Sequence, residues 1–162
     1  SSPGVKQMIL GGWQLAGMSR YQSGFPLQIS GGNALPIFSG NRPTYMGGQP
    51  IRSSVSTGSF DPATDVYLNS AAFSNGPLYG FGNLSRTANV RGFPLYDESL
   101  GIVKKFPIRE RASLEFRAEF YNFLNRVVFA PPTTNINSTS FGRVSALWNN
   151  PRQGQLGLRL NW

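Results

Sequence analysis

The sequence contains neither cysteine nor histidine among its 162 residues. The lack of cysteine excludes disulfides and thiol chemistry. Without either residue type, a Cys/His zinc site and a Ser–His–Asp triad cannot be assembled. Charged residues make up only 14 % of the chain, well below the roughly 25 % of soluble domains. We therefore expect no enzyme, no cofactor and no metal site.

The sequence also lacks any apolar run near the roughly 18 residues that a membrane helix needs. A structure that spans a membrane would therefore have to be a β-barrel. The net charge of +8 fits lipopolysaccharide, an anionic ligand or nucleic acid equally well. However, the basic residues are scattered and form no nucleic-acid motif, so we expect no nucleic-acid partner.

The clearest pattern that is present lies in residues 153–162. Apolar Leu156, Leu158, Leu160 and Trp162 alternate there with small and polar residues. Successive side chains of a β-strand point to opposite faces, so this segment predicts a strand with one apolar and one polar face. Because its pattern ends on an aromatic residue, we interpret it as the closing strand of an outer-membrane barrel.

Three further segments alternate in the same way, over residues 11–22, 95–106 and 113–124, although Glu98 and Lys104 interrupt the apolar face of the second. Each is near the roughly 9–11 residues of a tilted spanning strand. We expect the following residues to face lipid: Trp13, Leu15, Tyr21, Leu114, Phe116 and Phe120. We expect the following polar residues to face the lumen: Arg20, Asp97, Glu115, Arg117, Glu119 and Arg159. For Glu115, Arg117 and Glu119, an ion-pair ladder is preferred to a role in holding a plug or guiding a substrate.

The connections alternate in length. A short turn at residues 107–112 joins the second and third strands, whereas residues 31–94 and 126–152 are long and rich in Gly, Pro, Asn and Ser. This alternation predicts an all-β, antiparallel transmembrane β-barrel fragment with a short periplasmic turn and long extracellular loops. We expect residues 25–30 to extend the first strand, and residues 60–74 to form turns and short strands.

Some loop residues have an alternative function that we consider less favoured. The aromatic residues could stack on a ligand, but we expect them to pin the loops: Phe38, Tyr45, Phe60, Tyr67, Phe73, Tyr79 and Phe81. The acidic residues could bind Ca²⁺, but their spacing matches no EF-hand loop and favours simple solvation: Asp61, Asp65, Asp97 and Glu98.

Seven motifs occur in an order that resembles one family. They are GGWQLAGMSRYQSGFPLQIS (11–30), GNRP (40–43), YLNSAAFS (67–74), FGNLSRTANVRG (81–92), FRAEFYNFLNR (116–126), FGRV (141–144) and PRQGQLGLRLNW (151–162). Together they resemble the C-terminal end of TonB-dependent outer-membrane receptors, notably the Oar-like group with a carboxypeptidase-regulatory-like domain. The resemblance implies a plugged barrel of roughly 22 strands, of which residues 1–162 would be the truncated C-terminal part.

The resemblance also implies a function and partners. It gives Leu156, Leu158, Leu160 and Trp162 the role of an assembly signal for the barrel-assembly machinery. It implies active uptake of a siderophore, oligosaccharide or peptide, driven by a TonB complex that would act through N-terminal regions absent from this chain. Lipid and lipopolysaccharide would surround the protein in the outer membrane of a Gram-negative-type bacterium. The alternative is a soluble or surface-attached β-sandwich with an adhesive or structural role.

Overall fold

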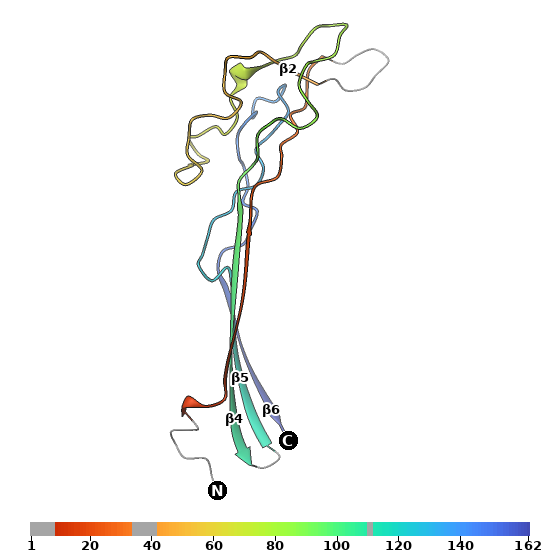
Figure 1. Ribbon diagram of the computed structural model, residues 1–162. Coiled ribbons are helices and arrows are strands. Elements are labelled where there is room, and N and C mark those ends of the chain that lie inside the picture. The colour runs from red at the N-terminus through yellow and green to blue at the C-terminus, as the bar shows by residue number, and fades with distance from the viewer. Residues whose placement is uncertain (1–8, 34–41, 110–111) are drawn as a thin grey trace. The chain divides into compact units, whose positions relative to one another are not determined.

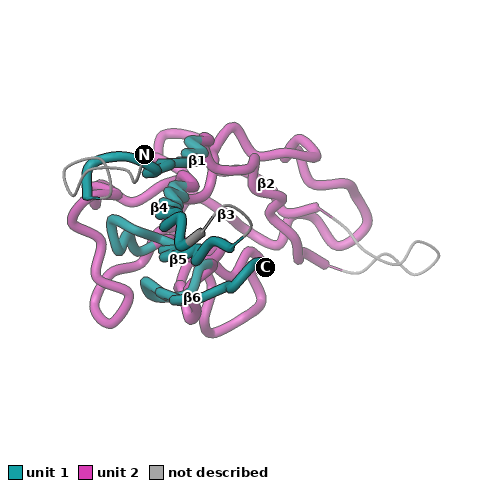
Figure 2. The backbone as a smooth tube through the Cα atoms, turned by 90° about the horizontal axis from the view of Figure 1, so that it is seen from below, with its two compact units in different colours: residues 1–21, 96–127, 149–162 teal, residues 22–95, 128–148 magenta. Residues whose placement is uncertain are grey.

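The computed structural model describes residues 9–33, 42–109 and 112–162. The chain divides into two compact units, each built from segments that are distant in the sequence (Figure 2). Unit 1 contains residues 1–21, 96–127 and 149–162, and unit 2 contains residues 22–95 and 128–148.

Unit 1 is built around a four-stranded sheet (Figure 1). Its strands are β1 (Trp13–Gln22), β4 (Leu95–Arg109), β5 (Ala112–Tyr121) and β6 (Gln153–Asn161), and they pair in the order β1-β4-β5-β6. Both β4–β5 and β5–β6 are antiparallel. All four long strands expected from the alternation are therefore present, with boundaries that differ by at most a few residues.

The largest boundary differences lie at the end of β4, beside the turn into β5, and at the far end of β5. The predicted turn at 107–112 is too long, because β4 continues to Arg109 and β5 begins at Ala112; residues 110 and 111 lie outside the described part. The ladder shifts register between Pro107 and Arg109, where the missing N–H of proline is tolerated. At the other end, Asn122 has a φ of 48°, which ends β5 before the predicted residue 124.

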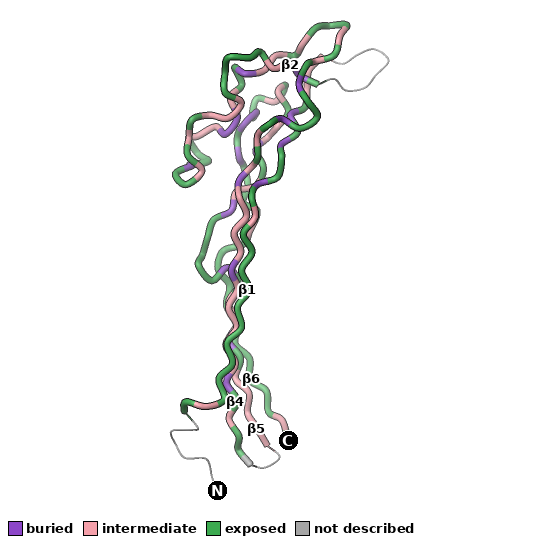
Figure 3. The backbone as a smooth tube through the Cα atoms, viewed as in Figure 1, coloured by how far each residue is buried: buried purple, intermediate pink, exposed green. Residues whose placement is uncertain are grey.

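The sheet is open, and β1 and β6 are its edge strands. Nearly every residue of these two strands is exposed (Figure 3). The described residues include no helix with the length and hydropathy needed to cross a membrane. Unit 1 thus presents two-faced strands rather than a sheet buried in a core.

Unit 2 consists mainly of the long connections, and it has a hydrophobic core of its own. Its regular elements are short: β2 (Thr44–Tyr45) pairs antiparallel with β3 (Phe73–Ser74), which directly follows the 3-10 helix η1 (Ser70–Ala72). The expectation of turns and short strands in residues 60–74 is thus confirmed. The core is formed by Leu27, Ile29, Phe60, Tyr67, Leu68, Leu84, Ala88, Phe93, Phe141 and Val144.

Residues 25–30 do not extend β1, and that expectation was wrong. Instead, Pro26 bridges to Arg91, and Ser30 bridges to Asn135. The segment reaches the core because Gly24 has no side chain: a Cβ there would lie 1.9 Å from the carbonyl oxygen of Gly92. Leu27 and Ile29 are buried as a result, so hydrophobic burial within unit 2 replaces continuation of the strand.

Candidate functional site

One face of the sheet is apolar. The ladder places Leu114 opposite Leu160 and Phe116 opposite Leu158, and directly paired residues share a face. Trp13 lies on the same face, because its ring is 4.9 Å from the Nζ of Lys104, the cross-strand partner of Phe116. By alternation this face holds the six residues expected to meet lipid and the three leucines of the expected assembly signal: Trp13, Leu15, Tyr21, Leu114, Phe116, Phe120, Leu156, Leu158 and Leu160. Trp162 follows β6 and is 92 % exposed.

The opposite face is polar, and it brings together the residues expected to line the lumen. Glu115 pairs directly with Arg159, while Arg117 and Glu119 follow at alternate positions of β5. Asp97 shares this face by its position in β4, and Arg20 lies opposite Tyr21 in the alternation of β1. The sequence therefore predicted correctly which residues share a face; the contact of each face with lipid or water stays a prediction.

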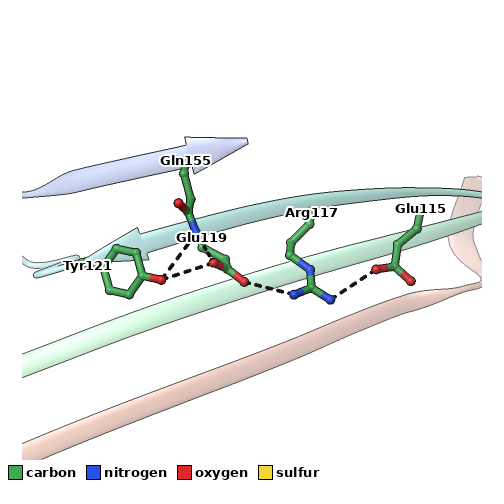
Figure 4. A network of polar contacts seen from close by, with 5 residues as sticks. All are labelled: Glu115, Arg117, Glu119, Tyr121 and Gln155. Carbon is green, nitrogen blue, oxygen red and sulfur yellow. Dashed lines mark hydrogen bonds and ion pairs between the residues drawn. The ribbon is translucent and has the colours of Figure 1, made fainter. Parts of the chain in front are cut away.

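A continuous polar network runs along β5 on this face (Figure 4). Arg117 joins two carboxylates, with Nη2 3.3 Å from Glu115 Oε1 and Nη1 3.4 Å from Glu119 Oε1. The Tyr121 hydroxyl and the Gln155 amide both donate to Glu119 Oε2. Because Arg117 lies between the two carboxylates and bonds both, the arrangement is an ion-pair ladder without the geometry of an acid–base pair.

Two charged residues lie on the apolar face, and no local pattern in the sequence indicated what compensates them. Glu98 is only 7 % exposed, and its Oε1 accepts a 2.7 Å hydrogen bond from Arg126 Nε. Arg126 also stacks over the ring of Tyr96, 5.4 Å from its centroid. The pairing explains how β4 keeps Glu98 on this face, since an unpaired buried carboxylate would be strongly unfavourable.

Lys104 is the second charged residue on the apolar face, and it is 2 % exposed. Its ammonium lies 4.9 Å from the ring centroid of Trp13 and 5.2 Å from that of Phe106. It also donates to the carbonyl oxygens of Ile9 and Gly11. Hydrogen bonds and cation–π contacts therefore replace its hydration.

Unit 2 contains a polar cleft of about 770 Å³, lined in part by Arg52, Tyr67 and Arg91. Arg52 stacks over the Tyr67 ring at 4.9 Å, and its Nη2 donates to the Val55 carbonyl. Its Nε is buried and has no hydrogen-bond partner among the described residues. The Tyr67 hydroxyl donates to the carbonyl oxygen of Arg91 over 2.6 Å. Burial raises the pKa of the Tyr67 phenol, and the charge of Arg52 lowers it by a smaller amount. The cleft thus places the Arg52 guanidinium over an aromatic ring.

The loop aromatics divide into buried and exposed groups. Phe60 and Tyr67 are core residues, with ring centroids 6.1 Å apart, and Tyr45 and Phe73 pack against the core. These four pin the loops as expected. By contrast, Tyr79 and Phe81 are exposed, and Phe38 lies outside the described residues.

The loop carboxylates make local contacts. Asp65 Oδ2 accepts from the backbone N–H of Asp61, and Asp61 Oδ1 accepts from that of Ala63. The described residues contain no group of three or more metal-binding side chains. These aspartates therefore stabilise a turn in unit 2.

Long antiparallel strands with one apolar and one polar face, joined by a short turn and long loops, define the wall of a transmembrane β-barrel. Residues 1–155 match the family model described as an outer membrane beta barrel domain, and the chain belongs to this family. It is accordingly an all-β protein of the outer membrane. The four long strands lie in one sheet, not in two packed layers as the β-sandwich alternative required. No curated protein and no solved structure matches the chain significantly.

Proposed function

We propose that residues 1–162 are the C-terminal part of an Oar-like TonB-dependent receptor that imports a ligand across the outer membrane. The main support is the packed core of unit 2, because long connections that fold around their own core present fixed side chains for recognition. The order of the seven sequence motifs supports the same family. The proposal is binding and transport, without catalysis.

Each part of the chain has a role in this proposal. The apolar face meets lipid, and the ladder of Glu115, Arg117 and Glu119 balances charge within a wet lumen. Leu156, Leu158, Leu160 and Trp162 present the signal for the barrel-assembly machinery. Regions outside this chain contact the TonB complex. Lipopolysaccharide surrounds the barrel, and nucleic acid is not a partner.

The polar cleft of unit 2 is the proposed place of ligand contact. Its two arginines and the ring of Tyr67 suit a ligand that carries both an anionic group and an apolar or cyclic part. Siderophores, acidic oligosaccharides and peptides all satisfy this chemistry.

The proposal is tested by measuring whether nutrient uptake through this protein requires TonB. A strain that lacks the gene is compared with a tonB deletion for growth on siderophores, oligosaccharides and peptides as limiting nutrients. We expect the two deletions to abolish use of the same nutrient, and the cloned gene to restore it only when TonB is present. Restored uptake without TonB would identify a passive channel and reject the receptor proposal.

A second test addresses the cleft. Arg52→Gln removes a cleft cation, whereas Arg86→Gln removes an exposed cation that does not line the cleft. We expect uptake of the identified nutrient to fall only in the first variant, at equal amounts of folded protein in the outer membrane. Equal uptake by both variants would remove the cleft from the proposal and leave the receptor assignment intact.

A further inference from the structure

Residues 9–12, which we call the turn, consist of the helical residues Ile9 and Leu10 and a bend at Gly11 and Gly12, and several contacts fix them to the sheet. The carbonyl oxygen of Ile9 accepts hydrogen bonds from Trp13 Nε1 over 2.9 Å and from Lys104 Nζ over 3.0 Å. Lys104 also donates to the carbonyl of Gly11. One buried ammonium therefore holds two carbonyls of the turn against β4.

Gly12 provides a second attachment of the turn to β4. Its carbonyl accepts a 2.9 Å hydrogen bond from the backbone N–H of Lys105. Its φ is +73°, and a Cβ at this position would lie 2.7 Å from the carbonyl oxygen of Lys105. Only glycine combines this backbone conformation with so close an approach to the neighbouring strand.

The two large side chains of the same turn are exposed in the described part of the chain. Ile9 is 62 % exposed and Leu10 is 76 % exposed, although both are large and apolar. Trp13, whose indole N–H is already bonded to the turn, is also exposed. Since Trp13 belongs to the apolar face of the sheet and its indole N–H bonds the Ile9 carbonyl, the turn is attached to the surface expected to meet lipid.

We propose that Ile9, Leu10 and Trp13 form a membrane-interface anchor, in which the turn enters the headgroup boundary of the phospholipid leaflet. The hydrogen bonds from Lys104, which we call the clasp, hold this turn against the barrel wall. Tryptophan and neighbouring aliphatic side chains favour this boundary. Lys104 is fully covered, so it serves the turn and does not bind a lipid phosphate. Because Gly12 lies beside Lys105, the anchor belongs to the end of the sheet that carries the β4–β5 turn. On the expected orientation this is the periplasmic leaflet.

Spin labelling measures the position of the anchor directly. Residues 1–162 contain no cysteine, so a nitroxide is attached to Leu10→Cys in the full-length protein, with any cysteine outside this chain replaced. The protein is folded into phosphatidylethanolamine/phosphatidylglycerol vesicles, and relaxation by oxygen is compared with relaxation by a water-soluble nickel chelate. Labels at Leu15→Cys and Gln14→Cys provide the apolar-face and polar-face references.

We expect the label at residue 10 to favour oxygen over nickel, at a depth shallower than that of the label at residue 15. A label more accessible to nickel than to oxygen, or shielded from both reagents by protein, would overturn the proposal. The measurement requires only the outer-membrane barrel, so its failure would leave TonB-dependent uptake unaffected.

The role of the clasp is tested with Lys104→Met, which retains chain length but removes the ammonium. Lys105→Met is the matched control, because Lys105 lies on the opposite face and pairs with Glu115. We expect the spectrum of the residue 10 label to show increased mobility only with Lys104→Met, while Lys104→Arg retains the restricted spectrum. Barrel folding is checked for each variant by its altered migration on unheated gels. Unchanged mobility in folded Lys104→Met would refute the clasp. If that variant does not fold, the test depends on Lys104→Arg: a restricted spectrum supports the clasp, and increased mobility refutes it.

Discussion

Charged residues of unit 1 differ in how much they depend on their partners. The carboxylate of Glu98 is almost completely buried, and Arg126 is the basic side chain bonded to it. Glu115 and Glu119 on the polar face share Arg117, but each carboxylate also has a second partner. Lys105 lies 3.7 Å from Glu115, and Tyr121 and Gln155 donate to Glu119. Removing the cation bonded to a buried carboxylate leaves an uncompensated charge, whereas a carboxylate that keeps other partners loses less. The same type of ion pair therefore has different energetic importance on the two faces.

This difference predicts unequal effects of two matched substitutions. We expect Arg117→Gln to lower the free energy of unfolding by no more than about 1 kcal/mol, because Lys105 still pairs with Glu115 and two polar side chains still donate to Glu119. Arg126→Gln should lower it clearly more, because the buried carboxylate of Glu98 then loses the charge that neutralises it. Urea titration of the protein folded in vesicles measures both changes. Equal effects would show that Glu98 is hydrated in the folded barrel.

Tyr67 predicts a pH effect on the stability of unit 2. Burial raises its pKa above the ordinary value of 10.0, so the folded state holds the phenolic proton more tightly than the unfolded chain does. The resulting stabilisation is fully present below the unfolded pKa, and it is lost as the pH rises through the folded pKa. We expect Tyr67→Phe to remove this loss of stability and to cost about 1 kcal/mol at neutral pH through the missing hydrogen bond to Arg91.

Ultraviolet titration of tyrosinate measures the pKa, and denaturant unfolding at neutral and alkaline pH measures the stability. Tyr79→Phe is the control, because this tyrosine is exposed. If the alkaline loss persists in Tyr67→Phe, another group is responsible for it.

At the scale of elements, the long strands could be predicted because alternation is a local property of the sequence. Residues 153–162 alternate without interruption, and β6 occupies Gln153–Asn161. The pattern in residues 95–106 is interrupted at Glu98 and Lys104, yet β4 runs through both. Their partners, Arg126 and the carbonyls of residues 9 and 11, are distant in the sequence. Alternation alone therefore predicted the strand but not the contacts that make its charges tolerable.

The core of unit 2 could not be predicted in the same way. Its members come from segments as distant as Leu27 and Phe141, and they follow no period of two or of 3.6 residues. The burial of Leu27 also depends on the close approach of Gly24 to Gly92, which no local pattern encodes. As a consequence, the expected extension of β1 was wrong, while the short strand at Phe73–Ser74 was foreseen only as part of a wider stretch.

The strand β6 allows a test of the two faces with adjacent residues. We expect Leu156→Arg to destabilise the barrel by about 2–4 kcal/mol if residue 156 lies near the membrane midplane, because the charge then faces hydrocarbon. Gln155→Arg should have little effect, since residue 155 pairs with Glu119 on the polar face. Unfolding in vesicles and the amount of folded barrel in the outer membrane measure both variants. The opposite ranking would reverse the assignment of lipid and lumen faces.

At the scale of the whole molecule, the connections determine orientation. A single short turn joins β4 and β5, while the long connections form unit 2. In outer-membrane barrels short turns face the periplasm and long loops face the exterior. We therefore expect the long connections to lie outside the cell and the β4–β5 turn to face the periplasm. The same rule requires β6 to run toward the periplasm.

Two epitope insertions test this orientation. Gly47 and Gly48 are exposed, have positive φ angles, and have no neighbouring atoms in the space a side chain would occupy, so an insertion between them should leave unit 2 folded. We expect antibody to label this epitope on intact cells. An epitope inserted between residues 110 and 111, in the β4–β5 turn, should be labelled only after the outer membrane is permeabilised. Labelling of the second epitope on intact cells, with the first protected, would invert the barrel and place the packed loops of unit 2 in the periplasm.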